Sequence, residues 1–321
     1  MKRLYAFMAT VLMASAFSIM GCDKSQATDE SSVRALLDGS GYTDEQQTNR
    51  YGSADTTLGA GGDNYLPTVA GYEYIPFVRF QRYIPRSGVT RNVNVTIPAY
   101  PGYDDTTALA VITVDFEGEL RVAADTTTNP IAVWRKPFHD VAVRKVYLTK
   151  STANRRAPRR GWRIVKVSPL LIATQSPDYG LRIVRLTATA RPSGEVFELT
   201  TADTMLAKDE LPTFLPNDTV TVRLTCESDG DSCWAFLHRG RVGNERPRYW
   251  RQAYWKTSTF AFERTWIVSD ENYDRPNVRP SVSDAIGWGT LWGDTSKHYV
   301  AAAWGIPYVV KHAGDAIPDD E

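Results

Sequence analysis

The spacing of apolar residues changes along the chain from a helical period to a strand period. Residues 31–39 carry three apolar residues at helical spacing, so they are predicted to form a short helix with one buried face. Residues 43–50 begin with the spacing of a capping box, which predicts a further helical turn. Residues 51–71 contain five glycines and few apolar side chains, which predicts a loop or linker.

From residue 72 onward, apolar and polar residues alternate, which is the period of a β-strand. Within one of these stretches the apolar phase changes between Val143 and Val146, and this predicts a β-bulge near Arg144. The strands predicted in this first half cover residues 92–97, 108–114, 119–122, 141–149 and 162–167.

The second half of the chain has no helical pattern. Short strands separated by turn residues are typical of an antiparallel sandwich. Ser176, Pro177 and Asp178 lie between two strand-like stretches and predict a joint between two domains. The strands predicted here cover residues 181–190, 196–199, 219–225, 234–239, 259–268, 285–292 and 299–310.

Two resemblances refine this architecture. The hairpin of residues 141–169 resembles the last hairpin of NTF2-like or cystatin-like α+β domains. The strand spacing after residue 176 resembles that of bacterial immunoglobulin-like domains. The expected fold class is therefore mainly β, with an N-terminal α+β domain over residues 31–175 followed by an antiparallel immunoglobulin-like β-sandwich over 176–310. Residues 311–321 are expected to be a disordered tail.

The start of the chain has the layout of a secretory leader. Lys2 and Arg3 precede an apolar stretch that reaches Met20, and this stretch is shorter than the ~20 apolar residues of a membrane span. The residues before and including Cys22, Ile-Met-Gly-Cys, resemble the lipobox of bacterial lipoproteins. The resemblance implies that residues 1–21 are removed, that Cys22 is lipidated, and that residues 22–30 form a tether.

A lipid anchor would place the protein in the cell envelope, facing the periplasm or the cell surface. Asp23 follows the lipidated cysteine and resembles the inner-membrane retention signal of enterobacterial lipoproteins. That rule depends on lineage, so the sequence leaves the choice between inner and outer membrane open.

Charge argues against a nucleic-acid partner. Lysine plus arginine and aspartate plus glutamate number 37 each, and removal of Lys2 and Arg3 with the leader leaves 35 basic residues against 37 acidic ones. A protein dedicated to polyanions carries a basic excess instead. Hydrophobic residues make up 42% of the chain, which is enough to form a core.

Cys226 and Cys233 remain once Cys22 is assigned to the anchor. An even pair in an exported protein predicts a disulfide, placed here at the tip of a β-hairpin. A redox or zinc pair is the alternative, but six intervening residues fit neither spacing. Glu227, Asp229 and Asp231 lie between the cysteines, and either a solvated acidic turn or a calcium site fits these carboxylates.

Catalytic motifs are absent from the sequence. No nucleophile elbow, phosphate-binding loop, dinucleotide fingerprint or zinc-protease motif occurs, and no cofactor is expected. His139 and Asp140 are interpreted as a turn after Pro137, because the further ligands of a metal site are missing. A Ser-His-Asp site assembled in space stays open, because its members need not be neighbours in sequence.

Two surface features are candidates for binding. The first is a basic run that meets either solvent or an anionic surface such as lipid headgroups. The second is a tryptophan-rich region, where Trp288 and Trp292 would share one strand face opposite Gly287 and Gly289, and either fill the core or stack on sugar rings. The basic run consists of Arg155, Arg156, Arg159, Arg160 and Arg163.

Three functions follow from these observations. The leading one is a lipid-anchored cell-envelope protein that acts as a non-enzymatic binding or scaffolding module, with another envelope protein or a glycan as its partner besides the membrane. The second is a module that binds a glycan or a small ligand. The third is an envelope hydrolase, which the absence of catalytic motifs makes the weakest of the three.

Overall fold

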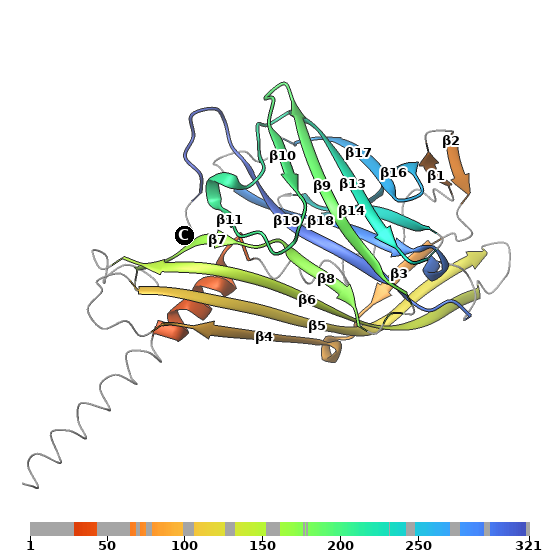
Figure 1. Cartoon of the computed structure of the whole chain (residues 1–321), viewed down its shortest axis with the longest axis horizontal. Helices are drawn as coiled ribbons and strands as arrows, with labels where there is room; N and C mark the ends of the chain where they lie inside the picture. The colour runs from red at the N-terminus through yellow and green to blue at the C-terminus, as the bar shows by residue number, and fades with distance from the viewer. Residues whose placement is uncertain are drawn as a thin grey trace, which may run out of the picture.

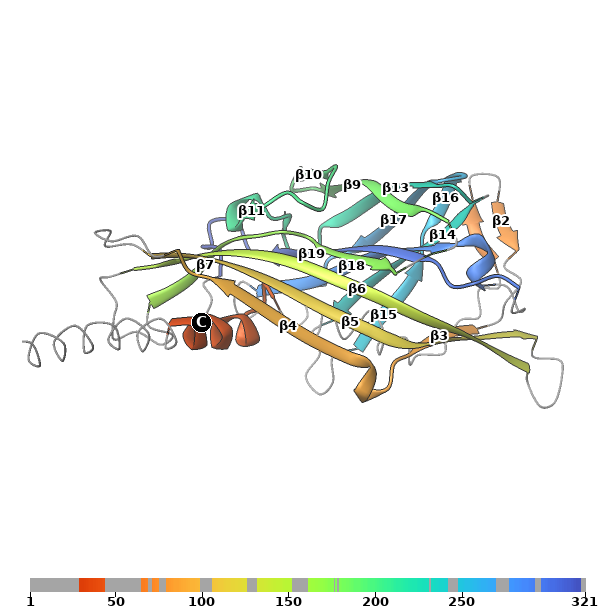
Figure 2. The ribbon, with the colours of Figure 1, turned by 60° about the horizontal axis from the view of Figure 1, so that its bottom comes forward.

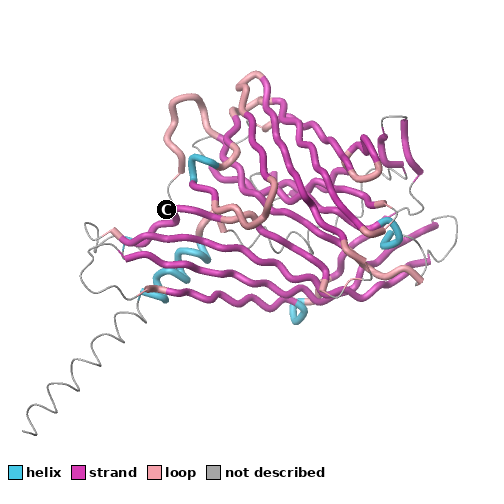
Figure 3. The backbone as a smooth tube through the Cα atoms, in the orientation of Figure 1, coloured by secondary structure: helices cyan, strands magenta, loops and turns pink. Residues whose placement is uncertain are grey.

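The computed structural model describes residues 29–43, 65–68, 71–74, 79–98, 106–125, 132–151, 161–175, 177, 179–230, 232–241, 248–269, 277–291 and 296–318. The fold is mainly β, as the sequence predicts, and strands form most of the regular structure in Figure 3. Among the described strands, β1 pairs with β16 and β12 with β19 in parallel, and the other pairings are antiparallel. The predicted leader, the predicted helical turn after residue 43, and Trp292 lie outside the described residues.

A seven-stranded sheet forms one layer, and it runs in the order β10-β9-β13-β17-β16-β1-β2. Its central strands are built mainly from the second half of the chain. The strands are β1 (Tyr65–Thr68), β2 (Gly71–Tyr74), β9 (Leu181–Arg191), β10 (Val196–Leu199), β13 (Thr219–Ser228), β16 (Trp255–Ser258) and β17 (Ala261–Ile267).

A twelve-stranded sheet forms the other layer, with the main path β11-β7-β6-β8-β19-β18-β14-β15. Strand β5 continues this sheet beside β6 and itself pairs with β3 and β4, while β12 pairs with β19. The strands are β3 (Arg79–Tyr83), β4 (Val89–Thr96), β5 (Thr106–Asp125), β6 (Ala132–Lys150), β7 (Trp162–Val167), β8 (Leu170–Thr174), β11 (Leu206–Ala207), β12 (Thr213–Phe214), β14 (Cys233–Arg241), β15 (Arg248–Ala253), β18 (Asn277–Gly287) and β19 (Ala301–Val310).

The two sheets stack as layers, and short 3₁₀ turns lie at strand ends (Figures 1 and 2). The seven-stranded sheet covers one face of β14, β18 and β19, which we call the outer face of the twelve-stranded sheet. All ten residues of β19 are buried, because its opposite face is covered as well. The 3₁₀ turns are η2 (Arg86–Gly88), η5 (Lys208–Glu210) and η6 (Trp288–Leu291).

A helix of residues 29–39, the N-terminal helix, packs on the inner face of the twelve-stranded sheet. Val33, Leu36 and Leu37 are fully buried, which confirms the predicted apolar face. Asp29 at the helix start forms an ion pair of 2.8 Å with Lys150 at the end of β6. The tether predicted over residues 22–30 is therefore too long by two residues, because Asp29 and Glu30 belong to the helix.

The long strands β5 and β6 correct two further predictions. β5 is one continuous strand of 20 residues, where two strands were predicted. β6 pairs with β5 without interruption around Arg144 and Lys145, so the predicted bulge is absent from that pairing, and the register shift that β6 shows against β7 lies between Tyr147 and Leu148. The apolar phase changes because Arg144 itself takes an inward position, where it donates hydrogen bonds to the carbonyls of Tyr42 (2.9 Å) and Gly305 (3.1 Å).

The boundary predicted at residues 175–176 does not separate two sheets. β8, from the first predicted domain, pairs with β19, from the second, with Leu171 opposite Trp304. β7 pairs with β11 in the same way. The twelve-stranded sheet therefore contains strands from both predicted domains. The predicted tail also contacts the body, because the Tyr42 hydroxyl donates a 2.6 Å hydrogen bond to the Pro318 carbonyl.

Candidate functional site

Cys226 and Cys233 are free and buried, so the structure gives no support to the predicted disulfide. Sequence alternation identified both strands correctly but not their partners. β13 pairs with β9 and β17, and β14 pairs with β15 and β18, so the cysteines lie on different sheets and do not close a hairpin. The hydrogen bond between the two thiols, together with burial, raises the pKa of Cys226 well above its usual value.

Within the described part of the chain, a cluster of buried ionisable side chains lies inside the curl of the twelve-stranded sheet. Arg82 on β3 donates two hydrogen bonds to Asp284 on β18, of 2.6 and 3.1 Å, and both side chains are 0% exposed. His238 on β14 adds a 3.2 Å contact from its Nε2 to Asp284 Oδ2. This arrangement requires the sheet to curl, because β3 and β18 are not neighbours within it.

Tyr299 extends this cluster to a second buried carboxylate. Its hydroxyl donates to Asp140 Oδ2 (2.6 Å) and accepts from Arg82 Nε (2.7 Å). Thr174 on β8 donates to the other oxygen of Asp140 (2.8 Å). We call these six residues the buried charge network: Arg82, Asp140, Thr174, His238, Asp284 and Tyr299.

The electrostatics of the network favour an ionised Asp284. Burial by itself would raise the pKa of this carboxyl, but the charge of Arg82 and the hydrogen bond with His238 outweigh it, so the pKa lies below its usual value. Burial raises the pKa of Tyr299 well above its usual value, although Arg82 opposes the shift. Asp284 therefore acts as a fixed negative charge and Tyr299 as a neutral donor.

Sequence reasoning missed this network. The sequence predicts a turn at His139 and Asp140, but both lie inside β6, where successive side chains point to opposite faces. His139 is exposed and contacts Asp115 at 3.1 Å, while Asp140 points inward to the network. No local motif marks the other members, because five strands and one loop supply them and only the curl of the sheet brings them together.

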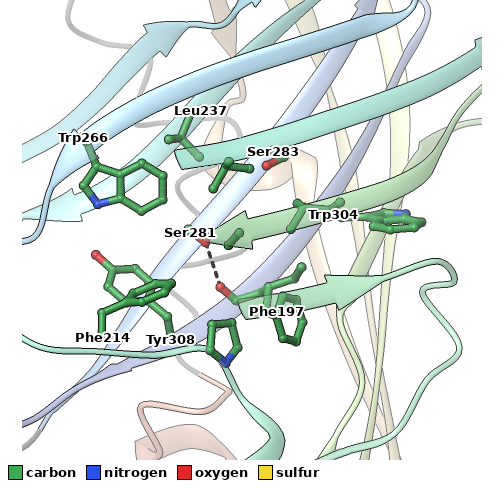
Figure 4. A pocket seen from close by; sticks show the side chains of 13 residues that line it. Phe197, Phe214, Leu237, Trp266, Ser281, Ser283, Trp304 and Tyr308 are labelled. Atoms are coloured by element: carbon green, nitrogen blue, oxygen red, sulfur yellow. Dashed lines mark hydrogen bonds between the residues drawn. The ribbon is translucent and has the colours of Figure 1, made fainter. Parts of the chain in front are cut away.

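A small cavity lies between the two sheets (Figure 4). Its volume is about 20 Å³, which is room for about one water molecule and too little for an organic ligand. Ser281, on its wall, donates a 2.9 Å hydrogen bond to the Ile306 carbonyl, drawn as a dashed line in Figure 4. The aromatic lining of Phe197, Phe214, Trp266, Trp304 and Tyr308 belongs to the core between the sheets.

A larger groove of about 470 Å³ opens at one end of the seven-stranded sheet. Arg182 and Glu227 form an ion pair on its rim, and Asp229 accepts a 3.2 Å hydrogen bond from the Gly180 amide. Its volume lies within the range of small-molecule sites, which is roughly 300–1,000 Å³. Neither this groove nor the small cavity is lined by a member of the buried charge network.

The predicted tryptophan face has a different geometry. β18 ends at Gly287, and Trp288 follows in η6, where it stacks on buried Trp234 with ring centroids 4.6 Å apart. The bare side of Gly287 faces Tyr179, because a Cβ built at Gly287 would lie 1.9 Å from the Tyr179 hydroxyl. Trp234 therefore belongs to the core. Trp288, one of the two tryptophans predicted to stack on sugar rings, instead stacks on Trp234.

Part of the outer face of the twelve-stranded sheet carries apolar side chains beyond the seven-stranded sheet. Leu109 on β5 is 42% exposed and Leu171 on β8 is 40% exposed. The register joins them, because Leu109 is opposite Tyr147 on β6 and Leu171 is opposite Val143. We call this patch the open outer face, defined by Leu109, Val111, Val141, Val143, Tyr147 and Leu171.

The structure describes only some of the remaining residues that the sequence singles out. Arg163 lies on β7 and is exposed, opposite Thr149 at the end of β6. Cys22 and the other arginines of the basic run, Arg155, Arg156, Arg159 and Arg160, lie outside the described residues. Asp231 does as well, and the described histidine, cysteine and carboxylate side chains include no group of three that could hold a metal ion.

Within the described residues, no helix has the length and apolar character needed to cross a membrane. No protein-family model and no curated protein matches the chain.

Proposed function

We propose that this chain is a lipid-anchored cell-envelope protein that acts as a non-enzymatic binding or scaffolding module. The leader and the lipobox-like residues before Cys22 support the anchor. The open outer face supports the binding role, because Leu109 and Leu171 are exposed on it, and exposed apolar groups on one face are typical of protein interaction sites. Its other four apolar side chains are half-buried, and Lys145, which is paired with Asp203, lies among them opposite Val111.

The buried charge network favours a structural role over a catalytic one. General acid–base and nucleophilic groups must reach a substrate, and in this network the charged groups are buried and bonded to each other. An envelope hydrolase would instead place such groups on the wall of a cavity. The hydrolase alternative therefore has less support than binding.

Site-specific crosslinking tests the binding role. A photoreactive residue at Leu171 should crosslink to one envelope protein in intact cells, and the substitution Leu109→Asp should reduce the yield about tenfold by placing a charge in the contact. The matched control is a photoreactive residue at Thr265, which is exposed on the seven-stranded sheet. Equal products from both positions, or no product from Leu171, would contradict the proposal.

A small-ligand or glycan module is a second candidate, and the 470 Å³ groove is the observation that favours it. Phe260 supplies an aromatic ring to its lining. A saccharide or small anion that raises the melting temperature of the protein should lose this effect in Phe260→Ala. Retention of the full shift in that variant would place the binding elsewhere.

The finer fold assignment is also a proposal. Packing of the seven-stranded layer, whose strands β10, β9, β13, β17 and β16 pair antiparallel, on β14, β18 and β19 supports a sandwich-like second half. The helix on the inner face of β5 and β6 supports an α+β first half. The pairing of β8 with β19 argues for one continuous body in place of two independent domains.

A further inference from the structure

Cys226 and Cys233 face each other across the space between the two sheets. Val222 and Cys226 lie on the same buried face of β13, because side chains two or four residues apart in a strand share a face. Leu237 and Cys233 share a face of β14 for the same reason. Val222 and Leu237 line one cavity between the sheets, so the two faces that carry the cysteines are turned toward each other. The two thiols are close enough for a hydrogen bond.

The groove of about 470 Å³ leads from the surface to this thiol pair. Cys226 lines the groove although its side chain is only 2% exposed, so the thiol lies at the inner end. Phe260 lines the groove beside it, and its carbonyl accepts a 2.8 Å hydrogen bond from the Cys226 amide. The groove therefore gives a small ion a route to a thiol that the core otherwise encloses.

The charges around the groove favour a cation over an anion. Glu227 and Asp229 line it against a single basic side chain, Arg182, so the lining has an excess of negative charge. An excess of this kind raises the local concentration of cations. Next to Cys233 in the chain, the hydroxyl of Ser232 accepts a 2.6 Å hydrogen bond from Lys256 Nζ. This ammonium group offsets part of the negative charge that two thiolates would place in the core.

A pair of thiols selects one kind of metal ion. Among the described residues, no three histidine, cysteine or carboxylate side chains could hold a metal ion together, so zinc, which takes four ligands, does not fit. Univalent copper prefers soft sulfur ligands and is satisfied by two thiolates in a near-linear arrangement. The raised pKa of Cys226 keeps its proton on the sulfur until a metal ion displaces it. Binding therefore becomes tighter as the pH rises.

We propose that Cys226 and Cys233, in their reduced form, bind one univalent copper ion at the inner end of the groove. Two copper–sulfur bonds form, the two thiol protons pass to solvent, and no electron is transferred. The ligands come from different sheets, so their spacing in the sequence does not match a metal motif. This site is independent of the lipid anchor and of the open outer face.

Copper transfer from a coloured chelate tests the site. The Cys22→Ser chain has no other thiol, and it is reduced and then freed of reductant under nitrogen. Loss of colour from the copper(I)–bicinchoninate complex should report one copper per chain. Cys226→Ser and Cys233→Ser should each lower the affinity by more than about a hundredfold. The matched control is Ser228→Ala, which removes a hydroxyl from the same groove and should bind copper fully.

Two further measurements complete the test. The apparent affinity should rise about a hundredfold per pH unit near neutral pH, because two protons leave. X-ray absorption of the copper-loaded Cys22→Ser chain should show two sulfur neighbours and no nitrogen or oxygen neighbour, a result that needs no cysteine variant to fold. Urea unfolding establishes that each cysteine variant is folded before it is titrated.

Three results would overturn the proposal. They are absence of transfer to the reduced chain, equal transfer to folded Cys226→Ser, and nitrogen or oxygen neighbours around the bound copper. Tighter binding of zinc than of copper to the same two thiols would also contradict the assignment of the metal.

Discussion

Arg82 and Asp284 are 202 residues apart in the chain and meet through two hydrogen bonds of 2.6 and 3.1 Å inside the curled twelve-stranded sheet. The pair joins β3, near the start of the sheet in sequence, to β18, near its end. Arg251 on β15 strengthens the same closure, because its Nη1 donates a 3.2 Å hydrogen bond to the Phe80 carbonyl on β3. These contacts join β3 to β18 and to β15, and so they hold the curled shape of the twelve-stranded sheet.

The first prediction concerns the cost of breaking this pair. Asp284→Asn should lower the free energy of unfolding by about 3–5 kcal/mol, because it leaves the guanidinium of Arg82 buried without its counter-charge. Urea unfolding monitored by tryptophan fluorescence measures the change. The control is Glu263→Gln, which breaks an exposed pair with Arg223 and should cost less than about 1 kcal/mol. Equal effects would contradict the structural role of the network.

The second prediction is the pH dependence of that effect. The pKa of Asp284 is below its usual value of 3.8, so the unfolded chain binds a proton at this carboxyl more readily than the folded protein does. The stabilisation is complete above about pH 4 and is lost as the pH falls through the folded pKa. The difference in unfolding free energy between wild type and Asp284→Asn should therefore narrow below pH 4. A difference that stays constant or widens would contradict the assignment.

The sequence predicts the strands of this protein better than it predicts their partners. Alternating side chains locate β9, β13, β17 and β19, because each has at least one buried face. Residues 277–284 of β18 are missed because Pro280 lies among them, and a proline argues against a central strand. In the structure Pro280 is opposite Pro307 on β19, so two residues without amide hydrogens face each other.

The pairing of the strands and the burial of polar side chains depend on contacts between distant parts of the chain, which the local pattern of apolar and polar residues does not encode. The short segment between Cys226 and Cys233 is typical of a hairpin, yet it carries the chain from one sheet to the other. Asp140 and Arg144 are polar residues on the buried face of β6, where an alternating pattern predicts apolar side chains. Their partners come from distant segments, so their burial could not be predicted from the sequence alone.

The third prediction is that the second half of the chain does not fold on its own. The isolated fragment 179–310 should show no cooperative thermal transition, because it lacks β8 and the N-terminal helix and leaves an edge of β19 unpaired. Circular dichroism and amide NMR of the fragment measure this, and residues 29–318 provide the matched control. A cooperative transition with dispersed amide resonances in the fragment would restore the two-domain interpretation.

The fourth prediction concerns the cysteines. In a Cys22→Ser chain, a thiol reagent applied without reductant should modify two groups in denaturant and fewer than about one in ten of them within minutes under native conditions. Cys226 and Cys233 are free and buried, and the raised pKa of Cys226 suppresses its thiolate. Mass spectrometry counts the adducts. Rapid native labelling of both would contradict the burial, and absence of labelling in denaturant would indicate a bond between them.

The fifth prediction tests the central claim, which is attachment to a membrane through Cys22. Mass spectrometry of the N-terminal peptide, taken from protein purified from cell membranes, measures it most directly. The account predicts that the mature chain begins at Cys22 and carries acyl chains on that residue, and that Cys22→Ala abolishes this modification and the membrane association. An unmodified Cys22, a retained leader, or normal membrane association of the Cys22→Ala variant would contradict it.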